Sequence, residues 1–150
     1  MSAVDPRLAG LDDLAAVQAL VQAAYAHYVP RIGAVPGPLR DDYAALIRDR
    51  RVHVIGPAGA LRAVLVLIPQ ADAMLLDNVA VAPGAQGQGH GRRMLQFAEQ
   101  MARQAGYRTI RLYTQEQMVE NLALYARIGY RETHRAHEIG LARVYMAKAL

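Results

Sequence analysis

Apolar side chains recur at three- and four-residue steps near the start of the chain, a spacing that predicts one face of an amphipathic helix. They stand at Leu14, Val17, Leu20, Val21, Ala24 and Tyr28. Asp12 or Asp13 is the expected N-cap of this helix, and Pro30 stands just past its end. The residues before the helix, 3–8, are expected to form a short edge strand.

Prolines and glycines, which disfavour helices and strands, then interrupt this pattern. Three prolines and two glycines between residues 29 and 40 predict a loop. Asp41 or Asp42 is expected to cap a short helix that follows, with Tyr43 and Ile47 on its apolar face.

Three segments further along have the composition of β-strands. Branched and aliphatic residues fill 52–55 and 61–68, and the Gly56–Gly59 turn between them predicts a hairpin. A third strand is expected over 74–81, and it ends before Pro83 and Gly84.

The second half of the chain alternates helices with strands. Its expected elements are, in order, a helix over 94–105, a strand over 109–113, a helix over 118–128, and strands over 130–137 and 143–149. Gly106 is the expected terminator of the first of these helices. The order predicts a mixed α/β fold with helices on both faces of a sheet.

Length and composition narrow the class of protein. The 150 residues suit one domain, 1–150, with enough chain to bury a core. The chain has no cysteine, which excludes disulfide scaffolds, cysteine-ligated zinc and a cysteine nucleophile. The longest apolar run, 63–68, is too short for a membrane span. The acidic N-terminal segment does not resemble a secretory signal, so a soluble cytoplasmic protein is expected.

The net charge of +4 depends almost entirely on arginine, since Lys148 is the only lysine among the 17 basic residues. Genome composition accounts for such a bias, and so does a need for bidentate contacts to phosphate. The arginines are spread out, with pairs at Arg50–Arg51 and Arg92–Arg93 but no basic run or basic helix face. Neither a nucleic acid nor a membrane is therefore expected as a partner.

A glycine-rich turn, 86–91, follows the third strand and opens the next helix. Such turns hold phosphate groups because the first N–H groups of a helix lack internal partners and glycine allows close approach. The dinucleotide motif G-x-G-x-x-G fails in both frames, since Arg92 or Met94 stands at the third glycine. A P-loop also fails, because His90 and Gly91 replace its Lys and Ser/Thr.

The turn fits a third pattern, Gln-x-x-Gly-x-Gly, at Gln86, Gly89 and Gly91. Together with the Val-Ala-Val segment at 79–81, it resembles the hallmark of the GNAT superfamily of acyl-CoA-dependent N-acetyltransferases. The resemblance implies a GNAT-like α/β fold with a mostly antiparallel sheet flanked by helices.

A second signature strengthens the resemblance. In the family an Asn on a helix precedes a Tyr by four residues, and Gly-Phe/Tyr then opens a strand; Asn121, Tyr125 and Gly129-Tyr130 match this order. Residues four apart lie on one helical face, so both polar groups point to the same place. The resemblance thus covers most of the chain.

The resemblance also implies where acetyl-CoA, the co-substrate, binds. Backbone N–H groups from Gln88 to Arg92 would hold its pyrophosphate, Gln86 would shape the turn, and the edge of 79–81 would pair with pantetheine. Asn121 would bond the pantetheine arm or order nearby water. The implied cofactor-binding residues are Val79, Ala80, Val81, Gln86, Gly87, Gln88, Gly89, His90, Gly91, Arg92, Asn121 and Tyr125. Arg93 would more readily be a solvated helix residue.

The implied reaction is direct attack of a primary amine on the thioester, with no covalent enzyme intermediate. The N–H of Val81 would stabilise the developing oxyanion, and Tyr125 would protonate the departing thiolate as general acid. Val81 and Tyr125 are thus the two implied catalytic residues.

The general base stays open. Asp77, acting through water, and Glu116 are weak candidates, because each is more readily explained as a structural or surface residue. The histidines offer nothing better: His53, His90, His134 and His137. No two histidines have metal-ligand spacing supported by nearby carboxylates, so no metal is predicted.

The acceptor site is the least defined part. In the family the N-terminal helices and their loop line it, and here that segment supplies Tyr25, His27, Tyr28, Arg31, Asp41, Asp42 and Tyr43. Tyr25 and Tyr28 would flank an amine and Arg31 would hold an acceptor carboxylate; alternatively, the tyrosines pack the helix and the charges are solvated. A small-molecule amine and a peptide amine both remain open, as does a homodimer.

Two functions of different classes remain. The favoured one is an acetyl-CoA-dependent N-acetyltransferase, and the alternative is a non-catalytic acyl-CoA-binding sensor or regulatory module. Tyr125 favours the enzyme, because a protein that only binds the thioester needs no acid at the thiol.

Overall fold

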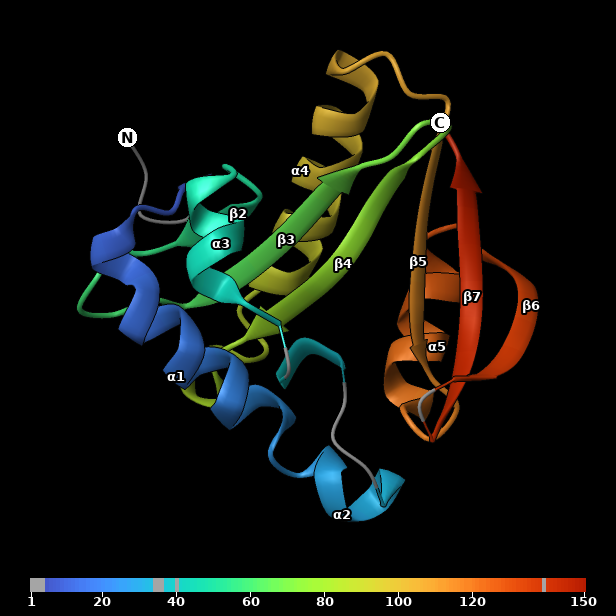
Figure 1. Cartoon of the computed structure of the whole chain (residues 1–150), viewed down its shortest axis with the longest axis horizontal. Helices are drawn as coiled ribbons and strands as arrows, with labels where there is room; N and C mark the ends of the chain where they lie inside the picture. The colour runs from blue at the N-terminus through green and yellow to red at the C-terminus, as the bar shows by residue number, and fades with distance from the viewer. Residues whose placement is uncertain (1–4, 34–36, 40, 139) are drawn as a thin grey trace.

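A seven-stranded sheet forms the centre of the computed structural model, which describes residues 5–33, 37–39, 41–138 and 140–150 (Figure 1). Its strands are β1 (Arg7–Leu8), β2 (Val52–Ile55), β3 (Ala63–Pro69), β4 (Met74–Val81), β5 (Thr109–Gln115), β6 (Arg131–Glu138) and β7 (Leu141–Ala149). They lie in the order β1-β2-β3-β4-β5-β7-β6, and all neighbours are antiparallel except β4 and β5. The mixed, mostly antiparallel sheet predicted from the sequence is confirmed.

Helices cover both faces of this sheet (Figure 1). They are α1 (Leu14–Tyr25), α2 (Tyr28–Ile32), α3 (Tyr43–Arg48), α4 (His90–Gln104) and α5 (Val119–Arg127). Helices α1 and α3 lie on one face, over β2 to β4, whereas α4 and α5 lie on the other. Among the described residues, no helix is long and apolar enough to cross a membrane.

The two faces of the sheet carry two separate apolar clusters. Val64 and Val66 of β3 pack with α1 and α3, while Leu65 and Leu67 of the same strand pack with α4. A strand buried on both faces is expected to be a continuous aliphatic run, which is what 63–68 shows. The strand at 52–55 has the same character, and all four of its residues are buried.

The largest departures from the predicted elements lie near the first helix. The Asp13 carboxylate caps no residue of α1; instead it accepts a hydrogen bond from the Gly10 N–H at 2.9 Å and pairs with Arg7. Pro30 does not follow the helical region but lies inside α2, where a proline in the first turn blocks no helical hydrogen bond. Asp42 caps α3 as predicted, accepting from the Ala45 N–H at 3.1 Å.

Other boundaries agree closely with the predicted ones. The strands β2 and β4 have their expected bounds, and β5 extends two residues beyond its expected end at Tyr113. The edge strand expected over 3–8 is present as β1, and residues 1–4 lie outside the described part of the chain. Short helical turns occupy part of the loop expected over 29–40, of which residues 34–36 and 40 are not described.

Candidate active site

The sheet splits between β4 and β5. These parallel strands pair only where Met74–Leu76 lies beside Ile110–Leu112, and from there they diverge (Figure 1). The pairing of β4 with β3 shifts register at the same level, because Val66 pairs with Asn78 but Leu67 pairs with Leu76. Asp77 is the unpaired extra residue of this bulge, and a bulge bends a strand away from its neighbour. The irregularity thus lies just before the Val79–Val81 edge.

The divergence leaves main-chain groups of β4 without a neighbouring strand. The Ala82 N–H donates to the Arg62 carbonyl on the β3 side at 2.9 Å. Successive backbone groups of a strand point to opposite sides, so the Val81 N–H points away from β3, into the gap. The Val79 carbonyl lies on the same side and accepts a hydrogen bond of 3.3 Å from the Tyr25 hydroxyl. The Val81 N–H therefore faces the gap between β4 and β5.

The glycine turn brings the N-terminus of α4 to this strand edge. Gly87 and Gly89 have φ of +79° and +86°, a left-handed conformation that glycine adopts without the strain of a Cβ. A Cβ built on Gly91 would lie 3.5 Å from a Val81 methyl group, so α4 starts against β4. This cradle of backbone N–H groups at the positive end of a 15-residue helix suits a pyrophosphate.

The side chains of the turn add little to this cradle of backbone N–H groups. His90 is buried and its Nε2 lies 3.2 Å from Gln88 Oε1, so only its backbone is available to a ligand. Gln86 and Arg92 are exposed beside the turn. Arg93 lies 3.9 Å from Asp5, which agrees with a surface role.

A cavity of about 390 Å³ connects the turn to α5. Val79 to Val81, Gln86 and Gly91 line one wall, and Asn121, Leu124 and Tyr125 of α5 line the opposite wall. The Tyr125 side chain is 6% exposed and packs edge-on against Tyr130. Burial raises its pKa well above the ordinary value, so the phenol keeps its proton at neutral pH. A protonated hydroxyl there is chemically suited to serve as an acid.

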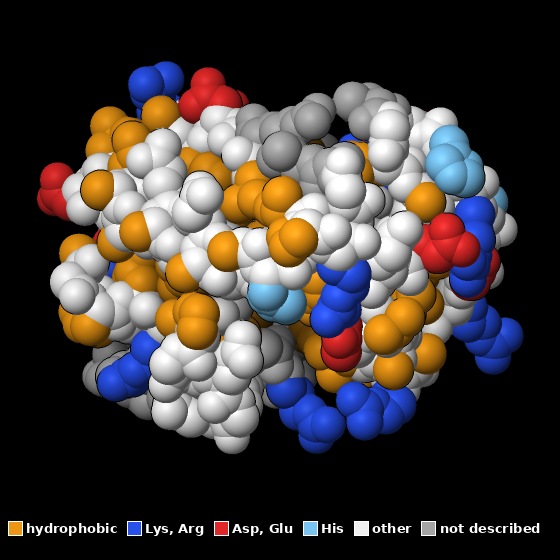
Figure 2. Space-filling model, turned by 90° about the horizontal axis from the view of Figure 1, so that it is seen from below, with side chains coloured by type: hydrophobic (Ala, Val, Ile, Leu, Met, Phe, Trp, Pro, Cys, Tyr) orange, Lys and Arg blue, Asp and Glu red, His pale blue; other side chains and the backbone are white. Residues whose placement is uncertain are grey.

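The surface around this cavity belongs to the side of the molecule where β4 and β5 diverge. Hydrophobic side chains are spread over it, and Lys and Arg side chains gather along its lower edge in Figure 2. A neighbouring cavity of about 330 Å³ is lined by three basic residues, Arg92, Arg127 and Lys148, and by Glu99. Lys148 is paired with Glu99 at 2.9 Å, whereas Arg92 and Arg127 form no ion pair within the described part of the chain.

A second, narrow cavity adjoins the first one. It shares Tyr25, Val79, Asn121 and Tyr125 with the first, and Asp77, Tyr113 and Gln115 add polar groups to its wall. The two cavities thus meet at Val79 and Tyr125, where a donor in one and an acceptor in the other would touch.

Several of the N-terminal residues predicted to line an acceptor site have partners elsewhere in the chain. Tyr28 lies 3.4 Å from Glu120, and Arg31 forms an ion pair with Glu120 at 3.0 Å, so Arg31 already has a carboxylate partner within the chain. Tyr25 is buried, and its hydroxyl donates to Asn78 Oδ1 at 2.7 Å. Contacts within the chain thus engage these side chains, and Tyr25, His27 and Tyr28 also line the first cavity.

The candidates for the general base lie in different parts of the structure. Asp77 lies in the second cavity, whereas Glu116 is exposed and paired with Arg135 at 3.1 Å. His53 is buried against Phe97, which lowers its pKa, and His134 stacks on Tyr145 at the sheet surface. Of the predicted candidates, only Asp77 reaches the meeting point of the cavities.

Sequence reasoning missed three polar residues that the structure adds to the site. Asn78 is a buried polar residue between the buried apolar positions Leu76 and Ala80, which was a signal in the sequence. Gln115 is also buried, but it lies in the polar stretch 114–117, which gives no such signal. Arg127 carries no local signal, since its place beside Arg92 depends on how α5 packs near α4.

Comparisons with known proteins agree with this geometry. The model of the acetyltransferase (GNAT) family matches residues 17–130, and the chain belongs to this family. It is therefore an enzyme of the acetyltransferase class, and its family supports transfer of an acetyl group from acetyl-CoA. A search of curated proteins gave no match.

Solved structures with the same fold include three bacterial or archaeal acetyltransferases. The ribosomal-protein-S18-alanine N-acetyltransferase of Escherichia coli has a TM-score of 0.77 and 21% identity, over 97% of this chain and 92% of that chain. PaiA N-acetyltransferase of Thermoplasma acidophilum, in complex with coenzyme A, gives 0.74 and 16%, over 97% and 98%. The IAA acetyltransferase of Bacillus cereus gives 0.68 and 22%, over 97% and 100%. At these identities the likeness concerns the fold.

Proposed function

We propose that residues 1–150 act as one domain that transfers the acetyl group of acetyl-CoA to a primary amine by direct attack. The observation that carries this proposal is the free main-chain edge at Val79–Val81, which lies between the phosphate-type cradle of α4 and the protonated phenol of Tyr125. Each of these three parts suits a different portion of one thioester. Direct attack, without a covalent enzyme intermediate, is supported by a second cavity that adjoins the first at Val79 and Tyr125.

The main-chain groups position the donor and stabilise charge. N–H groups from Gln88 to Arg92 bind the pyrophosphate, and the backbone of Val79 and Val81 pairs with pantetheine. The Val81 N–H then faces the thioester oxygen, where negative charge develops as nitrogen attacks the carbonyl carbon. A fixed N–H donor in a site that excludes water stabilises this charge without reorganisation.

Side chains of α5 complete the reaction. Asn121 holds the pantetheine arm, one helical turn before Tyr125 on the same face. Tyr125 gives its proton to the sulfur as the C–S bond breaks, which prevents the return of a free thiolate. Because burial keeps this phenol protonated, it is ready to act throughout the neutral pH range.

Replacement of Tyr125 by Phe tests this function. We expect kcat with a responsive amine to fall by about 100-fold, because a positioned acid contributes at least that much. The affinity for acetyl-CoA, measured by calorimetry, is expected to stay within about twofold, since a hydroxyl at the sulfur adds little to ground-state binding.

Tyr107→Phe is the matched control, because its hydroxyl bonds the Gln70 carbonyl at the protein surface, outside both cavities. Unchanged turnover in Tyr125→Phe would remove the proposed acid. Binding of acetyl-CoA without transfer to any amine would favour the sensor, and no binding at millimolar acetyl-CoA would refute the proposed function as a whole.

A further inference from the structure

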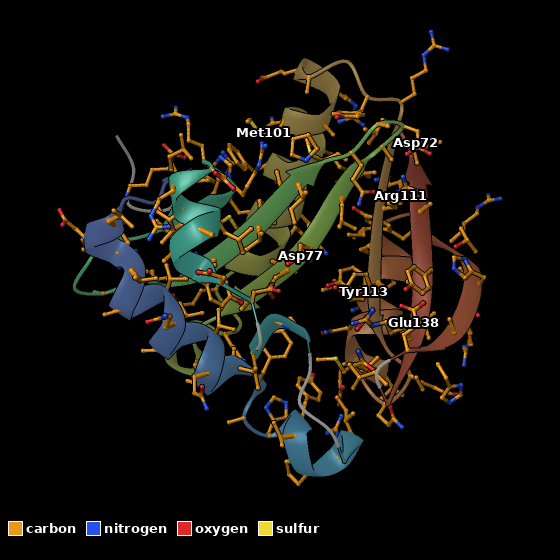
Figure 3. All side chains as sticks on the ribbon, in the orientation of Figure 1. Asp72, Asp77, Met101, Arg111, Tyr113 and Glu138 are labelled. Atoms are coloured by element: carbon orange, nitrogen blue, oxygen red, sulfur yellow. The ribbon has the colours of Figure 1, made fainter. Side chains whose placement is uncertain are left out.

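Asp77 occupies an unusual place in the sheet. It is the bulge residue of β4, and its side chain faces Tyr113 of β5 across the gap (Figure 3). The Tyr113 hydroxyl lies 3.5 Å from Asp77 Oδ1. The bulge therefore points a carboxylate into the cavity that reaches Val79 and Tyr125.

A second carboxyl group meets Asp77 from a different part of the chain. Asp41, just before α3, shares a side-chain hydrogen bond with Asp77. Burial, and then the hydrogen bond and charge of Asp77, raise the pKa of Asp41 to about 8, so Asp41 keeps a proton at neutral pH. The other oxygen of Asp41, Oδ2, is buried and has no hydrogen-bond partner among the described residues.

An uncharged oxygen completes the group. Gln115, at the end of β5, is only 3% exposed and lines the same cavity as Asp77. Within the described part of the chain, its Oε1 has no hydrogen-bond partner. A buried amide oxygen without a partner is costly, and such a group commonly belongs to a ligand site.

A buried network holds these groups in place. Asn78, next to Asp77, accepts from the Tyr25 hydroxyl at 2.7 Å and donates to the Tyr43 hydroxyl at 3.0 Å. Tyr43 in turn donates to the Pro38 carbonyl at 2.6 Å. The network thus ties the segment that carries Asp41 to the strand that carries Asp77.

We propose that Asp41, Asp77 and Gln115 form the binding site for the primary ammonium group of the acceptor. This inference rests on the proposed function, because the site has a role in acetyl transfer only if the adjoining cavity holds the thioester. An ammonium group has three N–H donors; Asp77 and Gln115 line the narrow cavity, and Asp41 joins them through its hydrogen bond with Asp77. An acceptor cation also removes the repulsion that forces the two carboxyl groups to share a proton.

The proton balance follows from this arrangement. Binding of the ammonium releases the proton shared by Asp41 and Asp77, so the cation meets two carboxylates. The ammonium then returns one proton to this pair, and its freed electron pair forms the C–N bond as the C–S bond breaks. The sulfur takes the Tyr125 proton, and the second proton that nitrogen loses restores Tyr125. The products are an amide, a thiol and one proton for solvent.

The test uses benzylamine as the cationic probe and benzyl alcohol as its uncharged counterpart. We expect the purified chain to bind benzylamine about tenfold or more tightly near pH 7.5, as charge-assisted hydrogen bonds predict, and Asp77→Asn and Asp41→Asn to lose this preference. Asp42→Asn is the matched control, because Asp42 is an exposed helix cap and asparagine caps equally well. Calorimetry measures binding, and a thermal melt confirms that each variant folds.

The outcomes keep the two proposals apart. Equal binding of the amine and the alcohol, or a preference that survives in both Asp77→Asn and Asp41→Asn, would overturn the ammonium site even if acetyl transfer occurs. Stabilisation by Ca²⁺ or Mg²⁺ in place of the amine would also overturn it. If the amine binds as expected but acetyl-CoA does not, the ammonium site stands as a binding site and the proposed function fails.

Discussion

The two cavities that meet at Val79 and Tyr125 are built from different materials. The donor side consists mainly of backbone groups, from the Val79–Val81 edge and the turn before α4, which lie within one short stretch of chain. The acceptor side consists of side chains, and Asp77 and Tyr113 are 36 residues apart in sequence. A backbone site depends on local conformation, whereas a side-chain site depends on how distant segments pack. Substitutions are therefore expected to affect the two sides independently.

Gly89→Ala is expected to give the largest effect that is confined to the donor side. At φ of +86° a Cβ strains the backbone by about 1–2 kcal/mol, and relief of that strain turns the first N–H groups of α4 away from the phosphates. We expect acetyl-CoA affinity by calorimetry to fall by about tenfold or more, with benzylamine binding unchanged.

Gly84→Ala serves as the control for this substitution, because Gly84 lacks a positive φ and a Cβ there would meet no atom within 4 Å. A parallel loss of amine binding in Gly89→Ala would show that the two sides are one cooperative unit and would contradict the comparison.

The same contrast explains what the sequence could predict. The turn at 86–91 and the Asn121–Tyr125 pair follow from spacing alone, because a strand edge, a glycine turn and a helix face are local structures. The mixed α/β class could also be anticipated from the order of strands and helices, although the order of the strands in the sheet could not. Only small differences arose, as at Pro30, where a proline in the first turn of α2 extends the helical region.

The acceptor side could not be predicted in this way. Nothing near Asp41 in the sequence indicates that it meets Asp77, because the contact depends on the Tyr25–Asn78–Tyr43 network and on the bulge in β4. Arg31 is a second example: the sequence left open whether it holds an acceptor carboxylate, and in the structure Glu120 of α5 pairs with it. Both outcomes depend on tertiary packing, which local patterns do not record.

A smaller effect, again confined to the donor side, is expected from Arg127→Ala. Arg127 and Arg92 line the basic cavity beside the start of α4, where phosphate groups outside the turn would lie. One exposed charge contact contributes up to about 1 kcal/mol, so we expect coenzyme A to bind up to about fivefold more weakly. The loss should shrink at high salt and for dephospho-coenzyme A, which carries one phosphate fewer.

Arg48→Ala, in α3 and outside the donor cavity, is the control for charge removal in general. An equal loss of affinity in that variant would assign the effect to net charge rather than to Arg127.

The smallest effect is expected from Asp41→Asn on the acceptor side, and it is an effect on the stability of the protein. Asp77 and Tyr43 face Asp41, and Tyr113 and Arg143 lie beyond them. The folded pKa of about 8 lies above the unfolded value of 3.8, so the folded chain holds a proton that the unfolded chain gives up between these values. This contribution is complete below about pH 4 and is lost as pH rises through 8.

An asparagine at 41 has no such proton to lose. Because the Asp41 side chain is only partly buried, solvent screening limits the difference, and we expect a gain of about 2 °C in Tm over wild type at pH 9, near 1 kcal/mol. At about pH 3 the two proteins should melt together, since Asp41 is then mostly protonated in both states. A saturating amine should raise the Tm of the wild type but not of the variant, because only the wild type offers the cation a second carboxylate. A gain in the variant that is the same at both pH values would show that Asp41 and Asp77 do not share a proton.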